Sequence, residues 1–238
     1  MYSDIQGHRH LHVPTIIGGN PLYRRDRAAI VLAGGVGKRI GGLDKPLLQI
    51  YGIPMLKYVM DAVREVCDEI VVSVGSPKRG MRYGNLIGDV KIAYDVLEDF
   101  GPLEGIRQAC RVVSRGRVAI VACDLPLIDP AIIEYLFSRI GPFDGAIPQW
   151  PDGKVEPLCS VFRTNCLTEA VEEACRRDER RIMNAYRTMG IRYVPTQELG
   201  RIDHRLISFT NVNDEHDLER ARRMAKKNRL NHGHLRVE

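Results

Sequence analysis

The sequence of 238 residues has no apolar run near the roughly 18 residues that a helix needs to cross a membrane. Its first stretch, MYSDIQGHRHLHVP, lacks the apolar core of a secretory signal. Internal repeats and low-complexity linkers are also missing. We therefore expect a cytoplasmic protein that does not bind membranes and that fits one domain.

Cysteine pairs with the spacing of metal ligands are absent. The six cysteines form no C-x-x-C pair, so neither a zinc site nor a disulfide framework is indicated. Most of them lie in segments with the pattern of buried elements. We expect reduced core cysteines at Cys67, Cys110, Cys123, Cys159, Cys166 and Cys175.

Aromatic residues make up only 6% of the chain and form no platform interleaved with cations, which binders of single-stranded nucleic acid need. The formal net charge of +5 comes from the end of the chain, because Glu219–Glu238 holds seven Lys or Arg and two Glu. A basic terminal helix is more often a solvated face than a binding stripe. We therefore expect no nucleic-acid partner.

What the sequence does have is a glycine-rich segment within Ala28–Leu48. It follows the run Ala28–Ala33, which is short and β-branched enough to predict a buried strand. The segment holds Gly34, Gly35, Gly37, Gly41, Gly42, Lys38 and Arg39, and it closes at Asp44-Lys45-Pro46. Glycines let backbone amides approach an anion, and cations add charge where a polyphosphate would lie. The glycines alone leave a surface loop as the alternative. Their spacing excludes a P-loop and a dinucleotide fingerprint.

Strands and helices alternate along the chain. Strands are predicted at 28–33, 69–74, 91–94, 117–122, 144–148, 158–163 and 191–195. Helices are predicted at 54–66, 101–114, 130–139, 164–176, 180–189 and 215–227, with Asp129, Thr164 and Asp214 as caps. Residues 75–84 are predicted as a loop and 205–210 as extended chain. This order predicts βαβ units, and therefore an α/β fold with a parallel sheet.

Ligands of such sheets bind at the carboxyl ends of the strands, where the glycine-rich segment, Asp95 and Asp124 fall. Asp124 ends an apolar strand, and Mg²⁺ prefers carboxylates together with substrate phosphates. A helix cap is the alternative for Asp124, but Asp129 already fills that role. Asp95 could contact a ribose, a base or a metal-bound water, or be a plain turn residue. Lys45 is placed to reach a β-phosphate, with a surface lysine as the alternative.

These motifs together resemble nucleotidyltransferases with a Rossmann-like fold, and in particular the MobA-like molybdenum cofactor guanylyltransferases. The resemblance covers most of residues 28–225. Its motifs are Leu32-Ala33-Gly34-Gly35, Asp44-Lys45, Asp95 before Gly101-Pro102-Leu103-x-Gly105, Cys123-Asp124-x-Pro126, Asp152-Gly153-x-x-Glu156-Pro157-Leu158, Arg180-Arg181-Ile182-Met183 and Asn211-Val212-Asn213. One departure is Ser73, where some members carry an asparagine that contacts GTP.

The resemblance implies a three-layer Rossmann-like α/β fold with a mostly parallel central sheet over residues 28–227. An N-terminal extension, 1–27, and a basic tail, 228–238, lie outside it. The implied reaction transfers GMP from GTP to molybdopterin carrying molybdenum or tungsten and releases pyrophosphate. The implied cofactor is Mg²⁺ or Mn²⁺, and proteins that deliver the pterin are further expected partners.

The resemblance also implies roles for individual residues. The GTP-binding residues would be Leu32, Ala33, Gly34, Gly35, Gly37, Lys45, Ser73, Asp95 and Asp124. Catalysis would fall to Arg39, Lys45 and Asp124, with Asp124 as the metal ligand. The acceptor side would be formed by Asn211, Asn213 and Arg181.

Two alternatives remain at this stage. One is a guanylyl- or cytidylyltransferase that acts on another phosphorylated acceptor, such as a corrinoid, a lipid alcohol or a sugar phosphate. The other is a module that binds GTP without turnover. Gly34 favours a purine nucleotide, because cytidylyl relatives tend to carry alanine there.

Overall fold

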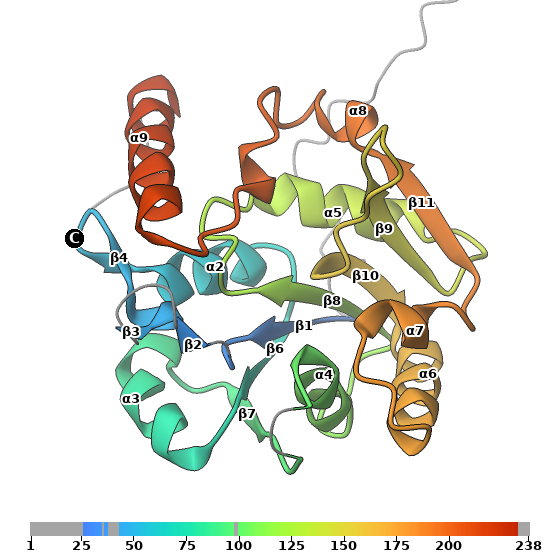
Figure 1. Cartoon of the computed structure of the whole chain (residues 1–238). Helices are drawn as coiled ribbons and strands as arrows, with labels where there is room; N and C mark the ends of the chain where they lie inside the picture. The colour runs from blue at the N-terminus through green and yellow to red at the C-terminus, as the bar shows by residue number, and fades with distance from the viewer. Residues whose placement is uncertain (1–25, 35, 38–42, 98–99, 233–238) are drawn as a thin grey trace, which may run out of the picture.

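A computed structural model describes residues 26–34, 36–37, 43–97 and 100–232. Its centre is a sheet of seven strands in the order β11-β9-β10-β8-β1-β6-β7 (Figure 1). These strands are β1 (Arg27–Leu32), β6 (Glu69–Val74), β7 (Lys91–Tyr94), β8 (Arg117–Ala122), β9 (Gly145–Gln149), β10 (Cys159–Arg163) and β11 (Ile191–Pro195). Only β10 runs antiparallel to its neighbours in this sheet. The mostly parallel sheet predicted from the sequence is confirmed.

The strand β1 is the middle of the sheet's parallel part. It pairs with β6 on one side and with β8 on the other, and all six of its residues are buried. Side chains alternate between the faces of a strand, so Val31 lies in one core and Ile30 in the other. A continuous apolar run is what a parallel strand covered on both faces requires.

Helices cover both faces of the sheet and give three layers (Figure 1). One core contains residues of α2 (Met55–Arg64), α3 (Pro77–Ile87) and α5 (Pro130–Arg139). The other contains residues of α4 (Pro102–Cys110), α6 (Thr164–Arg176) and α7 (Ile182–Tyr186). The α/β three-layer fold expected from the resemblance is therefore the fold observed.

Short elements form the rim above the strand ends. β2 (Val36–Gly37) pairs with β3 (Leu43–Asp44), and the 3₁₀ turn η1 (Lys45–Leu47) follows directly. β4 (Gln49–Ile50) and β5 (Ile53–Pro54) form a second small hairpin. A third core, which includes Ile50, Val212 and Leu218, packs this hairpin against α9 (Glu215–His232). α8 (Thr196–Leu199) follows β11.

The helix α3 lies where the sequence predicted a loop over 75–84, and that prediction is wrong. Ser76 is extended and Pro77 occupies the first turn, which is a favourable start for a helix. Tyr83 and Ile87 are buried and fix the helix to the core. Gly80 is a packing requirement, because an added Cβ would lie 2.9 Å from the ring of Tyr94.

Two further predictions are wrong in detail. Residues 205–210 are not extended, because Leu206 adopts a left-handed conformation (φ 50°) and η2 (Ile207–Phe209) follows it. Thr164 does not cap α6, since it is the first helical residue and Arg163 occupies the cap position. The helices α4 and α7 are also shorter than predicted, and α9 extends beyond Lys227.

Two predicted helix caps are confirmed. Asp129 accepts a hydrogen bond from the amide of Ala131, and Asp214 accepts one from the amide of Asp217, so both cap their helices. All six cysteines are free, four of them buried and Cys166 and Cys175 partly so. Within the described ranges, none of the helices combines the length and the apolar character of a membrane span.

Gly105 marks a close approach between α4 and β6, since an added Cβ would lie 2.4 Å from Ser73 Oγ. We expect Gly105→Ala to lower the free energy of unfolding by about 1–3 kcal/mol, the usual cost of overpacking. Ser73→Ala in the same background should recover most of that loss, because it removes the clashing oxygen. Denaturation in urea measures each change.

Gly84→Ala is the matched control. Gly84 lies inside α3, and no atom lies within 4 Å of an added Cβ, so this variant should be neutral or slightly stabilising. Equal destabilisation by the two alanine substitutions would contradict the packing argument.

Candidate functional site

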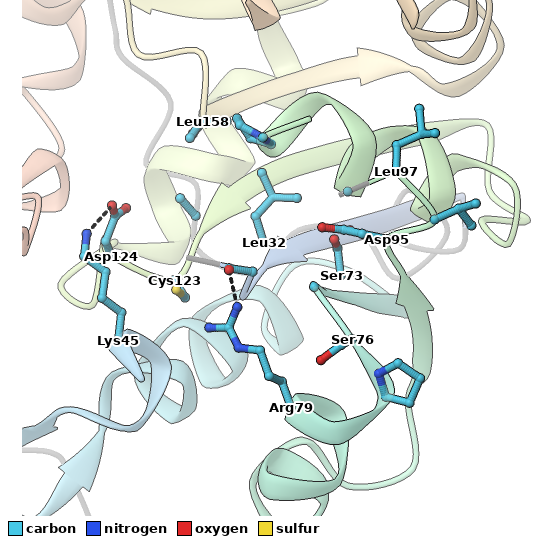
Figure 2. Close-up of a pocket in the computed structure, with 18 residues that line it drawn as sticks. Leu32, Lys45, Ser73, Ser76, Arg79, Asp95, Leu97, Cys123, Asp124 and Leu158 are labelled. Carbon is cyan, nitrogen blue, oxygen red and sulfur yellow. Dashed lines mark hydrogen bonds and ion pairs between the residues drawn. The ribbon is translucent and has the colours of Figure 1, made fainter. Parts of the chain in front are cut away.

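A cleft of about 710 Å³ opens at the carboxyl ends of β1, β6 and β8. Its lining includes Leu32 and Ala122, the last residues of β1 and β8, and Ser73, the residue before the last of β6. Six of the residues predicted to bind nucleotide line this cleft, namely Leu32, Gly34, Lys45, Ser73, Asp95 and Asp124. Figure 2 shows Lys45 and Asp124 together at one end of the cleft and Asp95 with Ser73 at the other.

The remaining nucleotide-site predictions fall elsewhere. Ala33 is fully buried beneath the cleft, and its amide donates to the carbonyl of Ser73 at 2.8 Å. Gly37 lies in β2, where it pairs with Leu43. Gly35 and Arg39 lie outside the described residues.

Lys45 is the cation at the Asp124 end of the cleft. Its Nζ lies 3.4 Å from Asp124 Oδ2 and donates to Asn213 Oδ1 at 2.9 Å. The side chain of Lys45 is 12% exposed and that of Asp124 is 22% exposed. The structure thus brings together a predicted catalytic pair and one residue of the predicted acceptor side.

Backbone hydrogen bonds fix the turn that carries Asp124. The amide of Cys123 donates to the carbonyl of Leu32 at 3.0 Å, which ties the end of β8 to the end of β1. The amide of Val212 donates to the carbonyl of Asp124 at 2.9 Å. This second bond holds Val212, which precedes α9, beside the cleft. The next residue, Asn213, is therefore close enough to contact Lys45.

The carboxylate of Asp124 has the features of a metal ligand. Its Oδ1 is buried and has no hydrogen-bond partner among the described residues. A buried carboxylate oxygen left without a donor is costly unless something satisfies it. Carboxylate oxygen is also the hard ligand that Mg²⁺ and Mn²⁺ take in proteins. These residues therefore fit a divalent cation at this end of the cleft.

Another acidic group, on the start of α9, is explained by local structure. Asp214, His216 and Asp217 can approach one ion, but both carboxylates already accept backbone amides, Asp214 from Asp217 and Asp217 from Asn213. We therefore assign the two carboxylates to helix capping.

Asp95 stands at the other end of the cleft. Its Oδ1 is buried without a hydrogen-bond partner in the described part of the chain. Burial and the nearby charge of Glu104 raise the pKa of Asp95 to about 6, against the opposing effect of Arg79. An unsatisfied carboxylate aimed into a cleft is suited to accept N–H or O–H donors from a ligand.

Glu104, a fully buried residue in the first turn of α4, supports this end of the cleft. It accepts hydrogen bonds from the amides of Val96 and Leu97 at 3.0 and 3.2 Å, and so holds the chain after Asp95. Burial raises the pKa of Glu104, but bonds from Arg107, Gln108 and these amides outweigh it and lower the pKa to about 2. The sequence reasoning missed Glu104, which is the unspecified position in Gly-Pro-Leu-x-Gly.

Arg79 is the second residue that sequence reasoning missed. It lines the cleft from α3 and donates to the carbonyl of Gly34 (Figure 2). It also donates to Asp44. The signal available for it was Ser76-Pro77, which is typical of a helix start and would have placed Arg79 on a helix beside the strand end.

The predicted acceptor side is only partly assembled at the cleft. Asn213 contacts Lys45, whereas Asn211 is half-buried and Arg181 is an exposed residue at the start of α7, and neither lines the cleft. Within the loop between β9 and β10, the indole N–H of Trp150 donates to Glu156 Oε1 at 2.7 Å. Burial raises the pKa of Glu156 against the opposing hydrogen bond from Trp150, and the charge of Asp124 adds to the increase.

The family model described as the MobA-like NTP transferase domain matches residues 29–190. A relative from Methanosarcina mazei, named a probable molybdenum cofactor guanylyltransferase, is 31% identical over 202 residues, which cover 82% of this chain and 90% of the relative. A molybdenum cofactor guanylyltransferase from Desulfosudis oleivorans is 30% identical over 202 residues, covering 84% of this chain and 96% of the relative.

Solved structures show the same similarity. The molybdopterin-guanine dinucleotide biosynthesis protein A from Archaeoglobus fulgidus superposes with a TM-score of 0.73 and 25% identity, covering 84% of this chain and 99% of that one. A nucleotidyl transferase from Methanothermobacter thermautotrophicus, at 17% identity and a TM-score of 0.66, shares the fold.

The lowered pKa of Glu104 predicts how stability depends on pH. Its pKa in the folded protein, about 2, lies below the ordinary value of 4.5, so its contribution is present above pH 4.5 and is lost as the pH falls toward 2. We expect Glu104→Gln to lower the free energy of unfolding at pH 7 by on the order of 3 kcal/mol. The difference from wild type should shrink as the pH falls from 4.5 to 3.

Urea unfolding at pH 7, 5, 4 and 3 measures this dependence. Glu65→Gln, at an exposed position after α2, is the control and should change stability far less at each pH. A difference between wild type and Glu104→Gln that stays constant with pH would contradict the assignment.

Proposed function

Since the chain belongs to the MobA-like NTP transferase family, we propose that it transfers GMP from GTP to the phosphate of molybdopterin carrying molybdenum or tungsten. The products are pyrophosphate and the guanine dinucleotide form of the cofactor. The names of the relatives support the reaction, and the cleft supports where it occurs. The single observation that carries the proposal is that Lys45, Asp124 and Asn213 converge at one end of that cleft.

The reaction is a substitution at the α-phosphorus of GTP. An oxygen of the pterin phosphate forms a bond to this phosphorus, and the bond to the β-phosphate oxygen breaks with its electron pair leaving on pyrophosphate. A phosphate monoester is already ionised near neutral pH, so the nucleophile needs no general base. Catalysis then consists mainly of positioning and charge stabilisation.

Lys45 supplies the positive charge among the described residues at the triphosphate end. Its ammonium is largely buried, where a charge interacts more strongly with a phosphate than it does in water. It would stabilise the negative charge that develops on the leaving pyrophosphate. Arg39 is proposed to assist from the glycine-rich segment, and this role stays a prediction.

Asp124 would hold Mg²⁺, with Mn²⁺ as the alternative. A divalent cation bound there supplies charge neutralisation at the phosphate oxygens. The protein's own contribution is the carboxylate on a turn that backbone bonds fix on both sides.

The guanosine would occupy the other end of the cleft. Asp95 has an unsatisfied carboxylate oxygen there, and Ser73, near the end of β6, lies next to it (Figure 2). Gly34 leaves room beside both Asp95 and Gly75. Contacts of Asn211 and Arg181 with the pterin, and a protein that delivers it, stay predictions.

Incubation of the protein with GTP, Mg²⁺ and metal-loaded molybdopterin tests the function through formation of pyrophosphate and the dinucleotide. We expect Asp124→Asn to lower kcat/KM by about 100-fold or more, because it removes the charge that holds the cation. Asp129→Asn is the matched control, since Asp129 lies in the same loop between β8 and α5 but caps α5, and asparagine caps a helix equally well. Retained Mg²⁺-dependent activity in Asp124→Asn would refute the metal role.

Gly34→Ala tests the fit of the base. An added Cβ would lie 3.7 Å from the amide nitrogen of Gly75 and 3.9 Å from Asp95 Oδ2, so the variant should fold normally. We expect the ratio of kcat/KM for GTP to that for CTP to fall by about 10-fold or more, because an added methyl group in a close-fitting pocket disfavours the larger base. Unchanged GTP turnover in this variant would count against this placement of the purine.

The acceptor is tested separately with the wild-type protein. Transfer of GMP to a corrinoid or lipid phosphate, and not to molybdopterin, would contradict the proposed acceptor.

A further inference from the structure

The side chain of Asp44 is a buried carboxylate that takes its donors from a single helix. It is 5% exposed and accepts hydrogen bonds from Arg79, Arg82 and Tyr83 of α3. Residues three and four apart lie on one face of a helix, so these donors point the same way. A buried charge with several donors is held in one geometry, because loss of any donor leaves it partly unsatisfied.

Arg79 does more than bind this carboxylate. One nitrogen of its guanidinium donates to Asp44, and another donates to the carbonyl of Gly34, just beyond β1. The rigid fork of a guanidinium suits such a bridge between two acceptors. Arg79 therefore fixes the distance between the end of β1 and the turn at Asp44.

Tyr83 reinforces the same link. Its ring is fully buried, and its hydroxyl lies 2.8 Å from Asp44 Oδ1 and 3.5 Å from the carbonyl of Ala33. Gly75 makes room for the bridge, because an added Cβ there would lie 3.3 Å from Arg79 Nη1. The bridge is thus built from the helix, the strand end and the turn.

The residue that follows Asp44 is Lys45, whose ammonium lies between Asp124 and Asn213. We propose that Arg79 is a positioning residue, which by holding Asp44 sets where Lys45 stands in the cleft. This inference rests on the proposed function, because it concerns binding and transfer of a nucleotide at the same site. The guanidinium contacts Gly34 and Asp44 at once, and this bridge supports a role in fixing the geometry of the site, with Lys45 as the proposed phosphate contact.

Calorimetric titration with GTP and Mg²⁺, without acceptor, tests the inference in Arg79→Ala, Lys45→Ala and the double variant. We expect Arg79→Ala to weaken GTP binding by about 10-fold, and to add little when Lys45 is already alanine. Such non-additivity is the signature of one residue acting through another, and a general loss of stability would not produce it. Additive losses in the double variant would overturn the proposal.

Two further variants separate geometry from charge and from folding. Arg79→Lys keeps the charge but loses the planar fork, whose two terminal nitrogens reach Gly34 and Asp44 separately, so it should bind GTP nearly as weakly as Arg79→Ala. Arg82→Ala is the matched control: Arg82 also donates to Asp44 but is 57% exposed, and no contact with Gly34 is recorded for it. It should change GTP affinity less than about 2-fold. Full rescue by lysine, or an equal loss in Arg82→Ala, would contradict the bridge.

The same titrations distinguish the two levels of the argument. Wild-type protein that binds no GTP would contradict the proposed function itself. Wild-type protein that binds GTP, with an affinity that Arg79→Ala leaves unchanged, would contradict the positioning role alone.

Discussion

The site depends on three neighbouring parallel strands that end at the same level. Backbone bonds continue across their ends, from Ala33 to Ser73 on one side and from Cys123 to Leu32 on the other. The chain leaving each strand is therefore held against the chain leaving the next, and polar side chains that the apolar core excludes gather there. This registration puts Gly34, Ser73 and Asp124 around one cleft, although they lie far apart in the sequence.

Two buried carboxylates support the cleft without facing a ligand. Glu104 holds the turn after Asp95 from α4, and Asp44 joins the turn before Lys45 to α3. Burying a carboxylate carries a desolvation cost, and both recover it through several charge-assisted hydrogen bonds. These hydrogen bonds fix two segments, the chain after Asp95 at one end of the cleft and the turn before Lys45 at the other. Asp95 and Lys45 thus each follow or precede a turn that a buried acid ties to a helix, Glu104 within α4 and Asp44 to α3.

The parts of the site that follow strands could be predicted from the sequence. Asp95 and Asp124 each lie at the carboxyl end of a predicted strand. Because strands that alternate with helices run parallel, their carboxyl ends lie at the same edge of the sheet. Arg79 and Glu104 could not be found in this way, because their importance comes from partners distant in the chain. The sequence did not predict the helix α3, because Gly80 and Gly84 have low helix propensity. In the structure, the burial of Tyr83 and Ile87 outweighs this propensity.

The contacts of Lys45 hold its ammonium at the end of the cleft where we propose that the triphosphate binds. Its bond to Asn213, at 2.9 Å, has ordinary hydrogen-bond geometry, whereas its distance of 3.4 Å to Asp124 is long for one. A neutral amide oxygen therefore holds the ammonium in place without cancelling its charge. An ammonium has three donors, so the charge remains available to a phosphate. The ion pair of Lys45 with Asp124 uses Oδ2, and Oδ1 of the same carboxylate stays unsatisfied among the described residues. In the proposed reaction, Asp124 would attract the cation and Lys45 the triphosphate, and both side chains would be in position before the substrate arrives.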